Sequence, residues 1–197
     1  MSDFLFGPDP TPPSAPSPLA EAHRLAGLIG ARRELVIGLF RLAADWLDEE
    51  PLLAAALALI ETAVPAEAGS VMMLDRRQGD LYLAAAAGAV NQDVRSYRRP
   101  ADEGLAGYVL GLGQPVRINH IDFEPGWHAD AVGQYGLAVR QILAVPIRVR
   151  QRLIGCLELV NRRGVGEPSF SGDDELLLSD AGECLGILFS LRGERPA

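Results

Sequence analysis

The sequence predicts an α+β sandwich built around one antiparallel sheet, and the order of its apolar segments is the main evidence. Helical periodicity dominates the first third, strand-like runs interrupted by one helix follow, and a helical pattern closes the chain. Two strand-like runs, 141–149 and 153–160, are joined only by residues 150–152. Because a parallel pair needs a long crossover, we expect these neighbouring strands to be antiparallel.

The N-terminal region divides into a leader and a helical part. Residues 1–18 hold six of the fourteen prolines and favour extended, solvated chain. Apolar residues then recur at helical spacing from Leu19 to Trp46, and Pro51 opens a second helix at a position that proline tolerates. We therefore expect a disordered leader at 1–18, an N-terminal helix at 19–50 and a folded domain at 51–192.

The folded domain begins with a hairpin, because two apolar runs flank the polar segment 75–80. Asp102 and Glu103 precede the next helix, where carboxylates suit the dipole of a helix start. The expected elements are strands at 69–74 and 81–87, a helix from about 105, a strand at 115–118, an irregular segment at 119–136, the two strands above, a loop at 161–169 and a final helix from Asp173 to about Arg192.

Charge and composition exclude several classes of protein. The net charge of −8 would repel a phosphate backbone, and no dense basic run offsets it, so nucleic acid is not an expected partner. All 18 basic residues are arginine. Without a lysine the chain has neither a P-loop nor a Schiff-base lysine, which removes the enzymes that depend on them.

The two cysteines, Cys156 and Cys184, fall in core-like patterns and form no CxxC motif, so we expect buried thiols in a reducing compartment. The longest apolar runs are too short to span a bilayer, and the N-terminus lacks a basic stretch followed by an apolar core. The sequence therefore predicts a cytoplasmic protein without a membrane partner.

Four segments of the folded domain follow one another in a recognisable order: GSVMMLD with LYLAAAAG (69–88), DEGLAGYVLGLGQPVRI (102–118), NHIDFEPGWH (119–128) and GCLELVN with the residues that follow it (155–175). In this order they resemble the GAF family of small-molecule sensing and regulatory domains. The resemblance is to GAF domains of cyclic-nucleotide phosphodiesterases and bacterial signalling proteins. It implies a GAF-like sandwich whose antiparallel sheet of five to six strands carries the terminal helices on one face and short helices and loops on the other.

The last segment is similar to a family signature made by Asn161, Arg162, Phe170, Asp174 and Glu175, with arginine where the signature has lysine. A basic residue leaving the last long strand can pair with a carboxylate in the first turn of the closing helix. We therefore predict an ion pair between Arg162 and Asp174, with Phe170 packed beneath it. This assigns the signature to architecture more than to ligand chemistry.

The resemblance places a ligand cavity near the irregular segment, which supplies apolar and polar groups. The candidate ligand-binding residues are Tyr108, Asn119, Asp122, Trp127 and His128. Alternatively, Trp127 closes the core under its loop and the others face water. Glu158 shares its strand side with Ile154, Cys156 and Val160; it either points into the cavity or lies at an edge in water, and we favour the edge.

Metal binding and catalysis find little support in the sequence. The spacing of His120, Asp122 and His128 matches no local metal motif, so no metal or other cofactor is expected. A Gly-x-Ser-x-Gly elbow is absent. Some GAF proteins are free methionine sulfoxide reductases, but Cys156 and Cys184 do not match the loop cysteines on which that activity depends. The sequence therefore predicts a protein without catalytic residues.

The function expected from the resemblance is a sensor whose cavity binds a small ligand, with cyclic nucleotides among the candidates. Its terminal helices would transmit occupancy to a signalling partner and pair in a homodimer through their apolar stripes, Leu25 to Trp46 and Leu177 to Phe189. The alternative is a protein–protein interaction module with a vestigial pocket. Binding of small metabolites distinguishes the two.

Overall fold

The computed structural model describes residues 16–44, 48–88, 97–121, 138–166 and 168–193. Within them, four helices accompany one six-stranded sheet in the order β3-β2-β1-β6-β5-β4, and all neighbouring strands are antiparallel. The helices are α1 (Pro18–Arg41), α2 (Glu49–Ala63), α3 (Gly104–Leu112) and α5 (Gly172–Gly193). The strands are β1 (Ala66–Asp75), β2 (Asp80–Gly88), β3 (Arg98–Pro100), β4 (Val116–Ile118), β5 (Ile142–Val149) and β6 (Arg152–Arg162).

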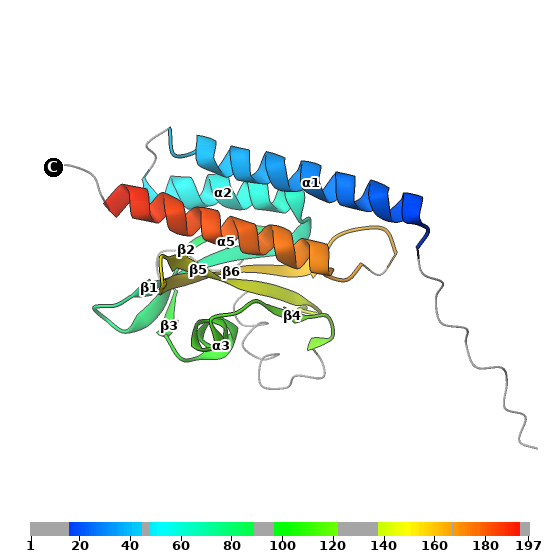
Figure 1. Cartoon of the computed structure of the whole chain (residues 1–197). Coiled ribbons are helices and arrows are strands. Elements are labelled where there is room, and N and C mark those ends of the chain that lie inside the picture. The colour runs from blue at the N-terminus through cyan, green and yellow to red at the C-terminus, as the bar shows by residue number, and fades with distance from the viewer. Residues whose placement is uncertain (1–15, 45–47, 89–96, 122–137, 167, 194–197) are drawn as a thin grey trace, which may run out of the picture.

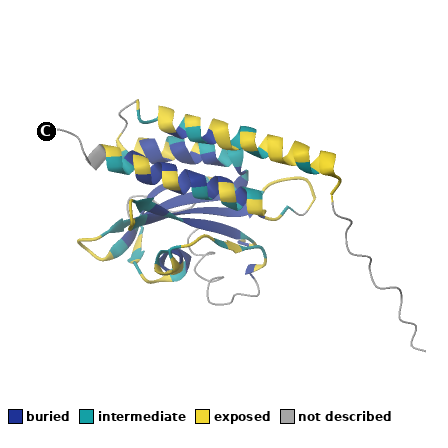
Figure 2. Cartoon of the chain, viewed as in Figure 1, coloured by how far each residue is buried: buried dark blue, intermediate teal, exposed yellow. Residues whose placement is uncertain are grey.

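The predicted α+β sandwich is confirmed, with helices layered on the sheet (Figure 1). Helices α2 and α5 lie directly on one face, α1 lies outside them, and α3 covers part of the opposite face. As Figure 2 shows, α1 is mostly exposed, whereas the central strands are mostly buried. The N-terminal helix ends at Arg41, and the second begins at Glu49, so Pro51 lies in its first turn.

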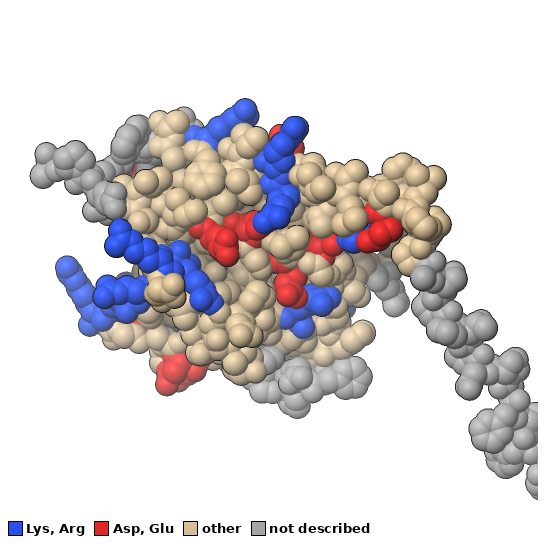
Figure 3. Space-filling model, viewed as in Figure 1, with Lys and Arg blue, Asp and Glu red and all other residues tan. Residues whose placement is uncertain are grey.

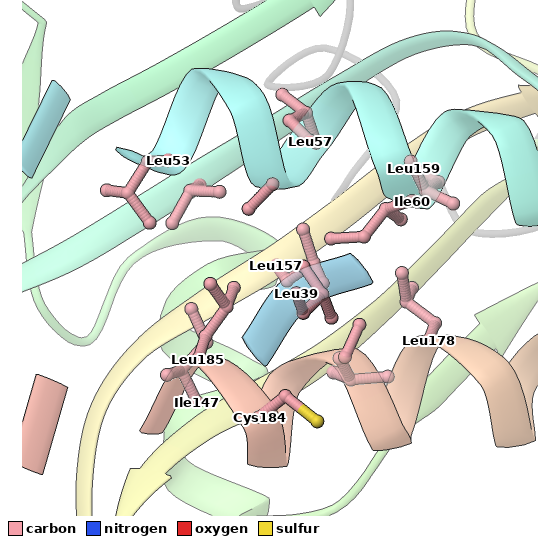
Figure 4. Packing of buried hydrophobic residues seen from close by; sticks show 14 of the residues in the cluster. Leu39, Leu53, Leu57, Ile60, Ile147, Leu157, Leu159, Leu178, Cys184 and Leu185 are labelled. Atoms are coloured by element: carbon pink, nitrogen blue, oxygen red, sulfur yellow. The ribbon is translucent and has the colours of Figure 1, made fainter. Parts of the chain in front are cut away.

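The face covered by α1, α2 and α5 encloses the larger apolar core. Figure 4 shows Leu157 and Leu159 of β6 pointing toward leucines of the three helices. Helix α5 approaches β5 very closely at two glycines: a Cβ at Gly186 would lie 1.6 Å from the carbonyl oxygen of Arg148, and one at Gly182 would lie 2.8 Å from that of Pro146. The backbone of α5 therefore touches the sheet where these glycines lie.

A second apolar core lies on the opposite face, beneath α3. Its buried members come from four strands, from α3 and from two positions outside these elements: Ala68, Met72, Leu81, Leu83, Leu105, Ala106, Val109, Ile121, Val139, Ile142, Ala144, Cys156 and Val160. Short strand β3 pairs with β2 at the sheet edge, and its three residues gave no periodic signal in the sequence. The turn between β5 and β6 contains no glycine, and Arg150 adopts a positive φ of 56° there.

Candidate functional site

Asn161 fixes the junction between β6 and the start of β5. It has a positive φ of 53°, which asparagine tolerates better than most residues, and it is 1% exposed. Its Oδ1 accepts hydrogen bonds from the backbone N–H of Arg140 (2.8 Å) and Gln141 (3.2 Å). Its Nδ2 donates to the Ala138 carbonyl (2.9 Å) and to Glu67 Oε2 (2.7 Å). The amide therefore uses all of its hydrogen-bonding capacity for structure.

Glu67 is the carboxylate at this junction, and its ionised form is stabilised there. Burial alone would raise its pKa, but hydrogen bonds from Asn161 and Arg140 together hold the pKa below its ordinary value. The Arg140 contact is an ion pair of 2.8 Å.

The predicted ion pair between Arg162 and Asp174 is confirmed. Nε of Arg162 lies 3.2 Å from both carboxylate oxygens, and the two side chains are 22% and 8% exposed. Asp174 also forms a reciprocal capping pair: its carboxylate accepts from the Ser171 N–H (2.8 Å), and Ser171 Oγ accepts from the Asp174 N–H (3.1 Å). The sequence spacing Ser-x-x-Asp carried this signal, which our sequence analysis missed.

Arg117 of β4 and Asn119, just after this strand, bind the backbone of Phe170, which precedes α5. The amide of Asn119 donates to the Phe170 carbonyl and accepts from the Phe170 N–H, both at 3.0 Å. Arg117 donates to the same carbonyl (3.0 Å) and pairs with Glu175 (3.0 Å). Phe170 itself is 1% exposed and belongs to the core of the helix-covered face. We call Arg162, Asp174 and the bonds to Phe170 the clasp, since they fasten α5 to β4 and β6.

A pocket of about 400 Å³ lies beside the clasp, at the ends of β4 and β6. The described residues that line it are Asn119, His120, Arg140, Gln141, Arg162, Gly166, Pro168 and Ser169. The lining residues therefore include two arginines, one histidine, one serine and two residues with side-chain amides, and none of these described lining residues is acidic. We call this space the edge pocket.

Glu158 lies on the sheet face beneath α3 and is 2% exposed, so the expectation that it lies at an edge in water is wrong. It accepts a hydrogen bond of 3.1 Å from Ser70 Oγ, which is also buried. Cys156 and Val160 share its face, but Ile154 packs against the opposite core. A register shift between Ile147 and Arg148 explains the difference, because it reverses the side-chain alternation at the start of β6.

Both cysteines are buried in free form. Burial raises the pKa of Cys156 well above the usual value, and nearby Glu158 adds to the effect. Burial, with Asp180 and Glu183, raises the pKa of Cys184 to about 11. Both thiols are therefore protonated at neutral pH and poorly suited to nucleophilic attack.

The structure locates two of the five candidate ligand-binding residues. Asn119 lines the edge pocket, while Tyr108 lies on α3 and is 44% exposed. Asp122, Trp127 and His128 lie outside the described residues. Arg140 and Gln141 line the pocket but gave no sequence signal, because they lie 21 and 20 residues from their partner Asn161 and only the fold brings them together. Among the described residues, no cluster of three potential metal ligands exists.

The terminal helices α1 and α5 run side by side and parallel (Figure 1). Arg24 pairs with Asp173, and Arg32 pairs with Asp180, so the pairs advance by eight and seven residues along the two helices. On the face in Figure 3, acidic and basic side chains are interspersed along this region. Both helices also expose large apolar side chains: Leu19, Leu25, Ile29, Ile37, Phe40, Leu176, Ile187 and Leu191.

The family model for the GAF domain matches residues 47–189, so this chain belongs to the GAF family. The fold is similar to a GAF domain from a phosphoenolpyruvate-protein phosphotransferase of Coxiella burnetii (19% identity, 83% of this chain, 95% of that chain, TM-score 0.70). It is also similar to free methionine-R-sulfoxide reductase from Neisseria meningitidis in complex with its substrate (24% identity, 81% of this chain, 88% of that chain, TM-score 0.64). A third similar structure is the A. aeolicus nlh2 GAF domain in an inactive state (19% identity, 84% of this chain, 99% of that chain, TM-score 0.65).

Membership of this family, together with GAF structures from signalling proteins among its structural neighbours, identifies a sensor or regulatory domain. None of the described helices has the length and apolar character needed to cross a membrane.

Proposed function

We propose that this chain is a non-catalytic GAF sensor that binds a small ligand and signals through its terminal helices to a partner protein. One observation carries the proposal: Arg162 lines the edge pocket and also pairs with Asp174 in the first turn of α5. A ligand that contacts Arg162 therefore acts on the helix start directly. Differential binding to two arrangements of this contact is what a sensor requires.

The edge pocket, at about 400 Å³, falls within the range of small-molecule sites. Cyclic nucleotides stay among the candidate ligands, since a phosphodiester suits arginine donors. Small-molecule binding is one use of this fold: NreA from Staphylococcus aureus, which is similar to this chain at 18% identity and a TM-score of 0.53, has a nitrate binding site.

The output surface of the proposed sensor is the outer side of α1 and α5. Ile29 of α1 is 68% exposed and Leu191 of α5 is 54% exposed, although both helices pack on the domain through other residues. Two such stripes on parallel helices can pair with a second copy of the chain in a helical bundle, which is the homodimer expected from the sequence. The same surface is available to a signalling partner.

Thermal-shift screening with cyclic nucleotides and other small metabolites tests the sensor proposal, with sedimentation equilibrium as the test of the dimer. We expect a specific upward shift with at least one ligand and a concentration-dependent dimer. The double variant Ile29→Gln with Leu191→Gln should become monomeric and keep the ligand shift. A monomer at all concentrations contradicts the dimer. A melting temperature that no compound changes contradicts sensing.

The second candidate is an interaction module with a vestigial pocket, and the exposed apolar residues of α1 and α5 favour it as much as they favour a sensor. The two proposals differ in the role of the edge pocket. In an interaction module, substitution of Arg140 changes neither ligand binding nor partner binding.

An enzymatic role comparable to that of the methionine sulfoxide reductase is a weaker candidate. That chemistry needs a reactive thiol, and the two cysteines of this chain are buried with raised pKa values. The test is reduction of free methionine-R-sulfoxide by the wild type and by Cys156→Ser. Turnover that the substitution abolishes contradicts the non-catalytic proposal.

A further inference from the structure

The edge pocket has the chemistry of an anion site, and we propose that its ligand is a compact oxyanion carrying phosphate or carboxylate groups. This inference rests on the proposed sensor function and gives the ligand a chemical class. Arg140 and Arg162 both line the pocket, and His120 and Ser169 add further polar groups. Guanidinium groups bind phosphate and carboxylate oxygens with charge-assisted hydrogen bonds, which are stronger than neutral ones.

The walls of the pocket are held in place by bonds that do not involve a ligand. Gln141 Nε2 donates to the Pro168 carbonyl (2.7 Å), and its Oε1 accepts from the Arg162 N–H (3.2 Å). Asn119 is fixed by its two bonds to Phe170. Pro168 is thus bonded to Gln141, just before β5, and Phe170 is bonded to Asn119, just after β4. A pocket with fixed walls loses little conformational entropy when a ligand binds.

Each arginine is anchored by a carboxylate that does not line the pocket. Glu67 pairs with Arg140, and Asp174 pairs with Arg162. These carboxylates orient the two guanidinium groups and partly offset their positive charge, and neither carboxylate lines the pocket. Arg162 uses Nε for Asp174 and Nη1 for the carbonyls of Pro65 and Arg163.

The overall charge of −8 makes anion binding at this pocket informative. A protein of this charge repels small anions in general, so weak accumulation of phosphate over its surface is not expected. Binding that survives physiological salt must therefore come from local groups. At the edge pocket these local groups are Arg140 and Arg162.

The edge pocket is also linked to the terminal helices through the ion pair of Arg162 with Asp174. An anion at Arg162 competes with Asp174 for the same guanidinium, and Asp174 caps the first turn of α5. The adjacent residue, Asp173, pairs with Arg24 of α1. Anion binding therefore weakens the clasp and loosens the first turn of α5, where the two terminal helices are joined.

Isothermal titration with inorganic phosphate and with malonate tests the ligand class. We expect saturable binding of at least one of the two, and Arg140→Gln should weaken it about tenfold or more. Arg77→Gln is the matched control, because it removes the same charge from the exposed β1–β2 turn, away from the pocket; its affinity should equal that of the wild type. Equal weakening by both variants, or no binding of either anion, overturns the inference.

Hydrogen exchange of the first turn of α5 tests the coupling. Saturating anion should speed exchange at residues 174–176 in the wild type. In Asp174→Asn the turn should exchange faster already without anion, the anion should bind several-fold more tightly, and the additional response should vanish. Unchanged or weaker anion affinity in this variant contradicts the competition for Arg162.

Failure of this inference can be told from failure of the sensor proposal. If neutral metabolites shift the melting temperature while phosphate and malonate do not, the chain is a sensor whose ligand is not an oxyanion. If no compound binds and Arg140→Gln leaves the protein unchanged in every assay, both proposals fall. Comparison of phosphate with malonate decides which oxyanion the pocket prefers.

Discussion

The two faces of the sheet are closed in different ways. On the helix-covered face, three helices pack apolar side chains onto the strands (Figure 4). Helix α5 also approaches β5 closely at Gly182 and Gly186. On the opposite face, α3 is the one described helix, and the buried side chains include the pair Ser70 and Glu158. The helix-covered face is therefore closed by apolar packing, whereas the opposite face also buries a hydrogen-bonded polar pair.

The clasp and the edge pocket lie where these two faces meet. Phe170 belongs to the core of the helix-covered face, yet its backbone is bound by Asn119, two residues from Ile121 of the other core. A change at this rim reaches both cores. Under the proposed sensor function, this position connects the structural signature to the ligand pocket.

The largest expected effect comes from Gly186→Ala, which tests the close contact of the helix-covered face. The new Cβ would lie 1.6 Å from the Arg148 carbonyl oxygen, so α5 must move away from β5. We expect a loss of about 3 kcal/mol or more in the free energy of unfolding, measured by urea denaturation.

Gly111→Ala on α3 is the matched control on the other face. Nothing lies within 4 Å of a Cβ at that position, and the backbone there is helical, so the protein should be unchanged or gain up to about 1 kcal/mol. Equal stabilities for the two variants would show that α5 is as loosely held as α3.

The contrast between the faces also explains what the sequence could predict. The layered sandwich, the antiparallel hairpins and the ion pair of Arg162 with Asp174 follow from periodicity, link length and the family signature. The burial of Glu158 did not, because the sequence does not show that the face it shares with Cys156 and Val160 is closed by α3, or that Ser70 of β1 lies within hydrogen-bonding distance. Arg140 and Gln141 were missed as pocket residues, since only the folded chain brings them to Asn161.

Ser70→Ala tests the buried polar pair of the second face. It removes a hydrogen bond to Glu158 and leaves that carboxylate less well satisfied in a site only 2% exposed. We expect a loss of about 1–3 kcal/mol by urea denaturation. Thr62→Ala provides the control, because it deletes an exposed hydroxyl that donates to the Ala58 carbonyl, and it should cost less than about 0.5 kcal/mol. Similar losses of unfolding free energy in the two variants would mean that the hydrogen bond from Ser70 to Glu158 contributes no more to stability than an exposed one.

Asp174→Asn tests the rim between the faces. It removes the charge that pairs with Arg162 but leaves an oxygen that can accept from Ser171, so we expect a loss of about 1 kcal/mol in unfolding free energy. Asp173→Asn removes a neighbouring charge whose pair with Arg24 is exposed, and it should cost less than about 0.5 kcal/mol. If the order of the two variants is reversed, the pair of Arg24 and Asp173 between α1 and α5 holds α5 more strongly than the clasp does.

The smallest effects come from two carboxylates with opposite pKa shifts. Burial raises the pKa of Glu61 on α2, with Arg163 opposing, so this group loses stabilising free energy as the pH rises from about 4.5 through its raised pKa. Glu61→Gln should therefore stabilise the protein at pH 7, by about 0.5 kcal/mol or less because the group is partly solvated, and the gain should disappear below pH 4.

Glu67 has a lowered pKa, so its contribution to the free energy of unfolding is present above its ordinary pKa and is lost as the pH falls. Glu67→Gln should therefore destabilise the protein at pH 7, again slightly, with the difference vanishing in acid. Thermal melts from pH 4 to pH 8 measure both, and the same sign for the two variants would show that the hydrogen bonds from Asn161 and Arg140 do not offset the burial of Glu67.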